Sequence, residues 1–289
     1  MSELLKRTVF GALYVACVVV SILWSPLLFS GLFFLFCLIA VDEYHRLVKS
    51  SGSLRIFTFL ATSLLWTLVQ CQAWRTNDPS LAKIISFAAL FAYIMMVIGV
   101  CIDEIWNHSG RPLQNWGNFL ISQVMIAAPM STMIYLYFLD KWLLLALFVL
   151  IWINDTGAYI VGSLTAKRDG GNHKMCPHVS PKKSWEGLIG GIVFTIIGSL
   201  VLYYCGWFDV ISVGKWGLLI AVVYALLVSA FGTMGDLIES LMKRSVGVKD
   251  SGLFLPGHGG ALDRFDSILL ASPILTFFCW VCYYAVPLL

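Results

Sequence analysis

The stretch LAKIISFAALFAYIMMVIGVCI, residues 81–102, decides the fold class of this chain. Lys83 is its one charged residue, and a helix of roughly 20 such residues crosses the hydrocarbon core of a bilayer. Similar runs recur along all 289 residues, of which 59% are hydrophobic and 12% are charged. Soluble domains carry about a quarter charged residues. With a mean hydropathy of +0.85, the sequence predicts an all-α, polytopic integral membrane protein.

About nine membrane spans are expected from the length of the apolar runs. The first two are short and only Ser25 and Pro26 separate them, so they form either a tight hairpin or one broken element. The expected spans are Thr8–Trp24, Pro26–Val41, Ile56–Trp74, Leu81–Ile102, Asn118–Leu139, Trp142–Leu164, Gly187–Trp207, Trp216–Ile238 and Ser267–Leu288.

The basic residues predict the orientation, because Lys and Arg near span ends resist translocation. With the N-terminus inside, all but four of the 19 Lys and Arg residues fall on the inner side; the exceptions are Arg75, Lys83, Lys141 and Lys215. The N-terminus is therefore expected in the cytosol and the C-terminus outside. In a bacterium, this would be the inner membrane. The first helix is expected to be retained, because no small-residue cleavage site ends it.

Two regions of different character follow one another along the chain. Residues 1–140 have short loops and apolar spans, and we expect them to serve as scaffold and to contact lipid. Residues 141–289 are expected to form the catalytic region. There, polar residues enter the spans, and two inner loops, about 165–184 and 239–264, are rich in Gly, Lys, His and Asp.

The segment GDLIESLMKR, residues 235–244, ends the eighth expected span. On a helix, Asp236, Glu239, Ser240 and Lys243 fall on a single stripe. A carboxylate at membrane depth is costly unless it faces a wet cavity, a partner or a metal. The alternative is an ordinary cytosolic helix end, in which Glu239 pairs with Lys243.

The segment LPGHGGALDRFDS, residues 255–267, precedes the last span. Its glycines permit a sharp turn that presents N–H groups to an anion. Asp263 and Asp266 share a face of the helix that follows. Together with Asp236, they suggest carboxylates that converge on one divalent cation, with Mg²⁺ favoured by its preference for oxygen ligands. Alternatively, both are plain helix caps and Arg264 is a surface charge.

Two further segments carry polar groups on the same inner side. In SPKKSWEG, residues 180–187, Lys182 and Lys183 suit a polyphosphate site but also fit the ordinary basic bias of inner loops. Ser184 is placed to cap the next helix, with Glu186 in its first turn. In NDTGAY, residues 154–159, Asp155 is a functional candidate, or it pairs with a lysine to fix packing.

The string SLMKRSVGVKDSGLFLPGHGGALDRFD, residues 240–266, resembles the signature of the phosphatidate cytidylyltransferases, also called CDP-diacylglycerol synthases. The segments GDLIES, SPKKSWEG and NDTGAY also resemble that family, so the likeness covers about residues 150–270. The N-terminal half matches only as generic membrane helices. Every fixed position of the signature is filled: Ser240, Lys243, Arg244, Lys249, Asp250, Pro256, Gly257, His258, Gly259, Gly260, Asp263, Arg264 and Asp266.

The resemblance implies that CTP and phosphatidic acid give CDP-diacylglycerol and pyrophosphate in the bilayer. It also implies Mg²⁺ held by Asp236 and Asp263, with a monovalent cation nearby. The hypothesis assigns catalytic roles to Asp236, Asp263, Asp266, Lys243, Arg244, Lys249 and His258. It assigns substrate contacts to Lys182, Lys183, Ser184, Glu239, Ser240, Asp250, Gly259, Gly260, Arg264 and Asp155. His258 either donates to a phosphate or orients its loop.

Two rival functions remain open from the sequence. Another Mg²⁺-dependent membrane enzyme acting on lipid phosphates would use the same acids. A cation-coupled transporter would use Asp155 and Asp236 as ion sites. No nucleic acid is expected as a partner, and a homodimer stays open.

Overall fold

The computed structural model describes residues 3–74, 79–107, 109–167, 171–212, 214–252, 254 and 259–285. Pro256, Gly257 and His258 of the signature lie outside these residues. The chain divides into two compact units. An N-terminal unit comprises Met1–Phe138 and Asp250–Phe265, and a C-terminal unit comprises Leu139–Lys249 and Asp266–Leu289. The loop at 250–265 thus belongs with the N-terminal helices, although its signature motif had suggested the catalytic region.

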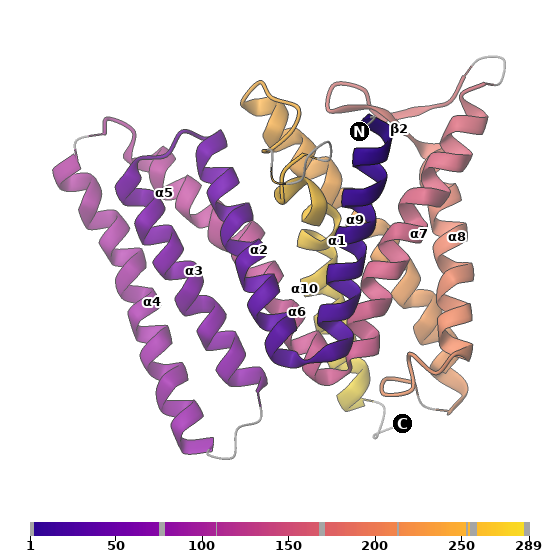
Figure 1. Cartoon of the computed structure of the whole chain (residues 1–289), viewed down its shortest axis with the longest axis horizontal. Coiled ribbons are helices and arrows are strands. Elements are labelled where there is room, and N and C mark those ends of the chain that lie inside the picture. Colours follow the sequence, from indigo (N-terminus) through magenta and orange to yellow (C-terminus); the bar gives the residue numbers. More distant parts are fainter. Residues whose placement is uncertain are drawn as a thin grey trace. The chain divides into compact units, whose positions relative to one another are not determined.

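The N-terminal unit is built from helices that run back and forth (Figure 1). A π-helical turn, η1, lies between α5 and α6, so the fifth expected span is an interrupted helix that begins earlier, at Pro112. The elements are α1 Glu3–Trp24, α2 Pro26–Leu47, α3 Gly52–Ala73, α4 Pro79–Asn107, α5 Pro112–Ile121, η1 Ser122–Ala127 and α6 Ala128–Leu139.

The first two expected spans are two separate helices. Ser25 adopts an extended conformation, and its side chain accepts a hydrogen bond from the N–H of Leu28 at 3.1 Å, which caps α2. Pro26 follows at the first helical position, where a missing N–H costs nothing. Because α1 packs against α2, this cap makes the pair a helical hairpin.

Aromatic rings bind the start of α10 to α2 inside the N-terminal unit. Phe265 is fully buried, and its ring lies 5.8 Å from that of Phe33 and 5.4 Å from that of Phe36. Phe36 also meets the ring of Phe254 at 5.8 Å. Such pairs contribute about 0.5–1.5 kcal/mol each beyond their burial. They hold Phe254 and the start of α10 against α2.

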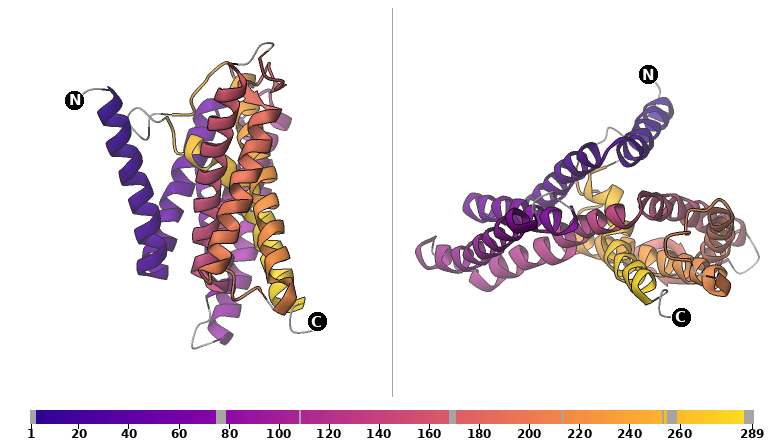
Figure 2. Two further views of the ribbon diagram at one scale, coloured as in Figure 1. Left: turned by 90° about the vertical axis from the view of Figure 1, so that its right-hand side faces the viewer. Right: turned by 90° about the horizontal axis from the view of Figure 1, so that it is seen from below.

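In the C-terminal unit, α8 packs against both α7 and α9, and the helices run side by side (Figure 2). Its C-terminal helix, α10, begins at Leu262 in the N-terminal unit and continues in this one from Asp266. The elements are α7 Lys141–Thr165, β1 Lys174–Cys176, β2 Ser180–Ser184, α8 Trp185–Tyr204, η2 Gly214–Trp216, α9 Gly217–Ser245 and α10 Leu262–Ala285.

A small antiparallel hairpin, β1–β2, forms where the sequence predicted only a polar loop. Lys174 pairs with Ser184 and Cys176 with Ser180, with an irregularity between them. The hairpin lies at the same end of the C-terminal unit as the end of α9, and the last turns of α10 lie at the opposite end (Figure 1). The polar segments of this unit are thus gathered at one end of its helices.

The membrane character follows from helix length and composition. Among the described residues, eight helical segments are long and apolar enough to span a membrane, and Thr8–Trp24 in α1 is a shorter apolar stretch. Each of these nine overlaps one of the expected spans, although several bounds differ and the expected end of the last span, Leu288, lies outside the described residues. One boundary differs near the polar stripe. The span was expected to end at Ile238, but α9 continues to Ser245. The prediction of an all-α polytopic membrane protein is confirmed, apart from the small hairpin.

Candidate functional site

A pocket of about 220 Å³ in the C-terminal unit holds several of the polar residues singled out from the sequence. It lies among α7, the β-hairpin, α8 and α9. Asp155 comes from α7, Lys182 and Lys183 from β2, and Asp236 from α9. The other lining residues are Asn154, Ala158, Tyr159, Met175, Ser184, Gly187, Leu188 and Thr233. Three sequence segments that are far apart along the chain therefore meet at one cavity.

An ion pair forms the centre of this pocket. The Lys183 ammonium lies 2.7 Å from Oδ2 of Asp236 and also donates to the carbonyl oxygen of Thr233 at 3.3 Å. Oδ1 of Asp236 accepts a hydrogen bond from the Ser240 hydroxyl at 3.2 Å. The side chains of Lys183 and Asp236 are 22% and 31% exposed. Both charges are therefore partly desolvated yet still open to a ligand that enters from water.

The predicted stripe on α9 exists, and it is internally paired. Beyond the link between Ser240 and Asp236, the Lys243 ammonium lies 2.6 Å from Oε2 of Glu239, one helical turn away. Both side chains of this second pair are buried. The ion pair that the alternative interpretation expected between Glu239 and Lys243 is thus present. Asp236 alone of the stripe's charged residues lines the pocket.

Asp266 lies close to this stripe. Gly235 allows the approach, because a Cβ there would be 2.5 Å from the backbone oxygen of Asp266. Asp266 is within electrostatic range of Asp236, Glu239 and Asp155. The side-chain Oδ1 of Asp266 accepts from the N–H of Ser267 at 2.6 Å. The start of α10 therefore comes close to the backbone of α9 at Gly235.

The hairpin that carries Lys182 and Lys183 is anchored at both ends. Ser184 caps α8, as predicted, by accepting from the N–H of Gly187 at 3.1 Å. Glu186 in the first turn of α8 contacts Nδ1 of His173 at 2.6 Å. Arg244 donates to the carbonyls of Val179 at 3.4 Å and Val248 at 2.7 Å. Arg244 thus ties the hairpin to the end of α9.

The glycine-rich segment in the N-terminal unit is organised around Asp263. Oδ2 of this carboxylate accepts from the N–H of Gly260 at 2.7 Å and from the N–H of Ser251 at 3.0 Å. Gly259 has a φ of +83°, a conformation that favours glycine. The sequence predicted that the N–H groups of the turn face an anion. For Gly260 that anion is a carboxylate of the protein itself.

Glu43 is a buried carboxylate that the sequence interpretation missed. It lies on α2 with 7% of its surface exposed, in the region expected to be scaffold. Oε1 accepts from the N–H of Ala261 at 3.0 Å, and Oε2 accepts from the N–H of Leu262 at 2.9 Å and the hydroxyl of Ser251 at 3.0 Å. The one available signal was the pair of acidic residues, Asp42 and Glu43, that follows the apolar run ending at Val41.

The remaining predicted residues lie outside these contacts. Lys249 and Asp250 are exposed, at the border of the two units. Arg264 is partly buried, and its carbonyl oxygen accepts from the hydroxyl of Tyr14 at 3.4 Å. His258 falls outside the described residues. Its role stays a prediction.

The carboxylates fit a hard divalent cation by their chemistry. Within the described part of the chain, no three acidic, histidine or cysteine side chains form a ready metal cluster. Mg²⁺ needs no such cluster, because it is usually held by one or two carboxylates together with waters and substrate phosphates. Asp236 lies in a pocket beside two lysines. This donor set is compatible with a metal–polyphosphate site.

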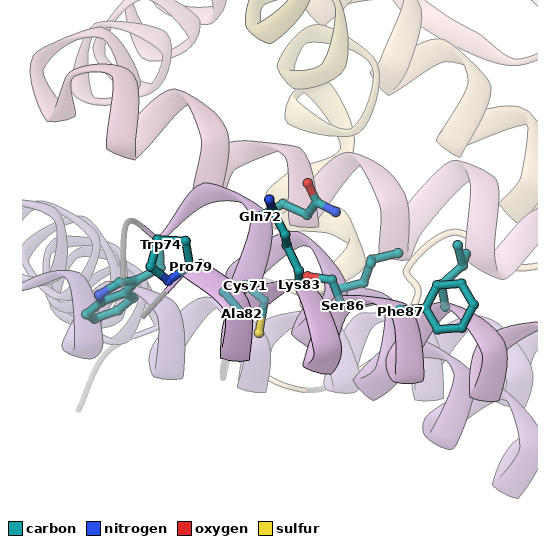
Figure 3. A pocket seen from close by; sticks show the side chains of 10 residues that line it. Cys71, Gln72, Trp74, Pro79, Ala82, Lys83, Ser86 and Phe87 are labelled. Atoms are coloured by element: carbon teal, nitrogen blue, oxygen red, sulfur yellow. The ribbon is translucent and has the colours of Figure 1, made fainter. Parts of the chain in front are cut away.

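A larger hollow of about 650 Å³ lies in the N-terminal unit between α3 and α4 (Figure 3). Of the described residues that line it, Lys83 is charged and none is acidic; they include Leu68, Cys71, Trp74 and Phe87. Size alone therefore does not identify a reactive site. The smaller pocket holds the paired carboxylate and ammonium groups.

Comparisons with protein families and with individual proteins both find cytidylyltransferases. The model of the cytidylyltransferase family matches residues 5–282. A phosphatidate cytidylyltransferase of Staphylococcus saprophyticus is 46% identical over 128 residues, which is 44% of this chain and 45% of the relative. Proteins of the same name from Staphylococcus haemolyticus and Staphylococcus aureus are each 45% identical over stretches of the same length. Each match thus spans a little under half of the relative.

Proposed function

The chain belongs to the cytidylyltransferase family, and we propose that it transfers the cytidylyl group of CTP to phosphatidic acid, giving CDP-diacylglycerol and pyrophosphate. The observation that carries the proposal is the pocket at which Lys183 pairs with Asp236, with Lys182 and Asp155 beside them. It lies at the polar end of membrane helices. A water-soluble nucleotide and a lipid headgroup can both reach such a place.

The reaction joins two polyanions. A phosphate oxygen of phosphatidic acid attacks the α-phosphorus of CTP, the bond from that phosphorus to the β-phosphate oxygen breaks, and pyrophosphate leaves with the electron pair. The attacking phosphate is already ionised near neutral pH, so no general base is required. Positioning and charge neutralisation therefore supply most of the catalysis.

The lysines of the hairpin are proposed to neutralise the phosphates. Lys183 and Lys182 both line the pocket, and Lys183 is held at its place by Asp236 and by the carbonyl of Thr233. A partly buried ammonium attracts a phosphate more strongly than one in water, because the local dielectric is lower. Arg244 supports the hairpin through its carbonyl contacts, and Lys243 is committed to Glu239. Neither Lys243 nor Arg244 lines the pocket, whereas Lys182 and Lys183 do.

We propose Asp236 and Asp263 as the residues that hold Mg²⁺, with Asp266 as an additional ligand or a partner that orients them. When bound, Mg²⁺ would neutralise charge on the triphosphate and stabilise the departing pyrophosphate. A monovalent cation nearby, the cytosolic exposure of the pocket, and a homodimer are parts of the same proposal. The basic residues support that exposure, since all but four would lie on the inner side.

The proposal is tested by pyrophosphate release from purified protein in lipid nanodiscs. CTP or dCTP should release pyrophosphate only when phosphatidic acid and Mg²⁺ are present, and a chelator should abolish the release. ATP, GTP and UTP should give none. Release without phosphatidic acid, or equally from all nucleotides, would favour another lipid-phosphate transferase. Ion uptake into vesicles without nucleotide turnover would favour the transporter.

Asp263→Asn provides the matched test of the metal assignment. We expect the variant to insert normally and to lose nearly all cytidylyl transfer, because an amide is a poor ligand for Mg²⁺. Asp209→Asn, an exposed residue between α8 and α9, is the control and should keep wild-type activity. An active Asp263→Asn variant would contradict the assignment.

A further inference from the structure

The two ends of the glycine-rich loop are fastened together by two carboxylates of the N-terminal unit. Glu43 binds Ser251 at the beginning of the loop and the N–H groups of Ala261 and Leu262 at its end. Asp263 binds the N–H of Ser251 at the beginning and that of Gly260 at the end. Ser251 therefore contacts both carboxylates, one through its hydroxyl and the other through its N–H.

Two glycines, Gly252 and Gly260, lie directly against the Glu43 carboxylate. A Cβ on Gly252 would lie 2.5 Å from its Oε1, and a Cβ on Gly260 would also fall well inside van der Waals distance of its Oε2. The lack of side chains on these two glycines therefore leaves room for the Glu43 carboxylate. Glu43 itself is nearly excluded from solvent. Burial of a carboxylate is costly unless several donors satisfy it.

The N–H groups of Ala261 and Leu262 stand at the beginning of α10. The first N–H groups of a helix lack intrahelical partners and attract anions. In this chain, they are bound by Glu43, which comes from a different helix. The contact fixes both the start of α10 and the axial position of the residue that follows, Asp263.

We infer that Glu43 is a positioning residue: by clamping Ser251, Ala261 and Leu262, it holds the Asp263 carboxylate in the orientation that binds Mg²⁺. The inference rests on the proposed function, which makes Asp263 a metal ligand. It assigns an indirect role in the reaction to a helix of the N-terminal half. Glu43 touches neither substrate nor metal in this account and acts through the loop.

The test compares Glu43→Gln with Glu104→Gln in full-length protein in nanodiscs. Glutamine keeps the shape of the side chain but turns an NH₂ group toward N–H donors. Glu104 contacts Ser109 and Asn115 and serves as the matched control. For Glu43→Gln we expect the Mg²⁺ concentration at half-maximal activity to rise by about tenfold or more, the effect of losing a hydrogen bond to a charged group. The control should stay within about twofold of wild type.

A second readout does not depend on activity. Hydrogen–deuterium exchange of peptides covering residues 250–266 should be faster in Glu43→Gln and unchanged in Glu104→Gln, since the clamp protects the Ala261 and Leu262 amides. Glu43→Asp, which keeps the charge, should restore part of both properties. If Glu43→Gln exchanges faster but needs no more Mg²⁺ than wild type, the inference is overturned. Unchanged exchange would also overturn it, whether or not the Mg²⁺ requirement rises.

Gly252→Ala covers the case in which Glu43→Gln does not fold. Its new methyl group would displace the Glu43 carboxylate, so it should also raise the Mg²⁺ requirement and the exchange rate. Gly31→Ala, on α2 with nothing within 4 Å of the new Cβ, is its control. If wild-type protein itself releases no pyrophosphate, the proposed function fails, whereas the exchange measurement still decides whether Glu43 clamps the loop.

Discussion

At the scale of single residues, the lysines near the pocket differ in what they are free to do. Lys183 pairs with a carboxylate that is itself partly exposed, whereas Lys243 pairs with Glu239 in the interior. Both look alike in sequence, as basic residues near the ends of apolar runs. The structure separates a lysine that can meet a ligand from one that neutralises a buried acid.

Replacing Lys183 should affect the reaction far more than the stability of the fold. We expect Lys183→Gln to lower kcat/KM for CTP by about tenfold to a hundredfold, the effect of losing one charge-assisted hydrogen bond. Steady-state kinetics measures the effect. Lys174→Gln, an exposed residue on the neighbouring strand of the same hairpin, is the control. Equal activity in both variants would remove Lys183 from the site.

Replacing Lys243 should instead destabilise the protein. Lys243→Met removes the ammonium group that pairs with the buried Glu239 carboxylate, and breaking such a pair costs about 3–5 kcal/mol in the free energy of unfolding. Thermal unfolding in detergent should show a lower Tm. The double variant Lys243→Met/Glu239→Leu should recover most of the loss. If the double variant is as unstable as the single one, the ion pair with Glu239 is not the reason that Lys243 stabilises the fold.

At the scale of elements, the α7–α8 contact sets the walls of the pocket. A Cβ on Gly190 of α8 would clash with the Val161 side chain of α7, and Gly191 lies against Asn154. Oδ1 of Asn154 also accepts hydrogen bonds from the hydroxyls of Ser229 on α9 and Thr195 on α8. Close backbone approach and this buried polar link hold α7, α8 and α9 together.

Adding a methyl group at this contact should loosen it. We expect Gly190→Ala to cost about 1–3 kcal/mol through overpacking, although alanine favours a helix more than glycine does. Differential scanning fluorimetry should report a lower Tm. Gly117→Ala, where a new Cβ meets nothing within 4 Å, should leave Tm unchanged or slightly raised. Equal Tm values for both variants would contradict the tight contact.

Helix positions were predictable from the sequence, because apolar length and caps are local properties. The cap of α8 by Ser184 and the stripe on α9 were foreseen in this way. The hairpin of residues 174–184 was missed, since two short polar strands have no apolar alternation to reveal them. Glu43 was missed because its partners lie more than 200 positions away. No local pattern encodes such a contact.

At the scale of the whole molecule, the distribution of charge predicts the orientation in the membrane. Nine spans would place the termini on opposite sides, and in the orientation we propose the N-terminus and the pocket's hairpin face the cytosol. Reporter fusions at the two ends should therefore be active on opposite faces, and protease added outside sealed cells should leave residues 171–184 uncut. Both reporters on one face would contradict an odd number of spans and require a different assignment for α1, whose apolar stretch Thr8–Trp24 is short.

The fate of the phosphorus atoms of CTP tests the central claim most directly. Purified protein in nanodiscs containing phosphatidic acid and Mg²⁺ is given CTP that is radiolabelled at either the α- or the γ-phosphorus. The account predicts that the α label passes into a chloroform-soluble lipid, whereas the γ label appears in water-soluble pyrophosphate. Transfer of the γ label to lipid would mean a kinase reaction. That result, or no transfer of the α label, would contradict cytidylyl transfer by this chain.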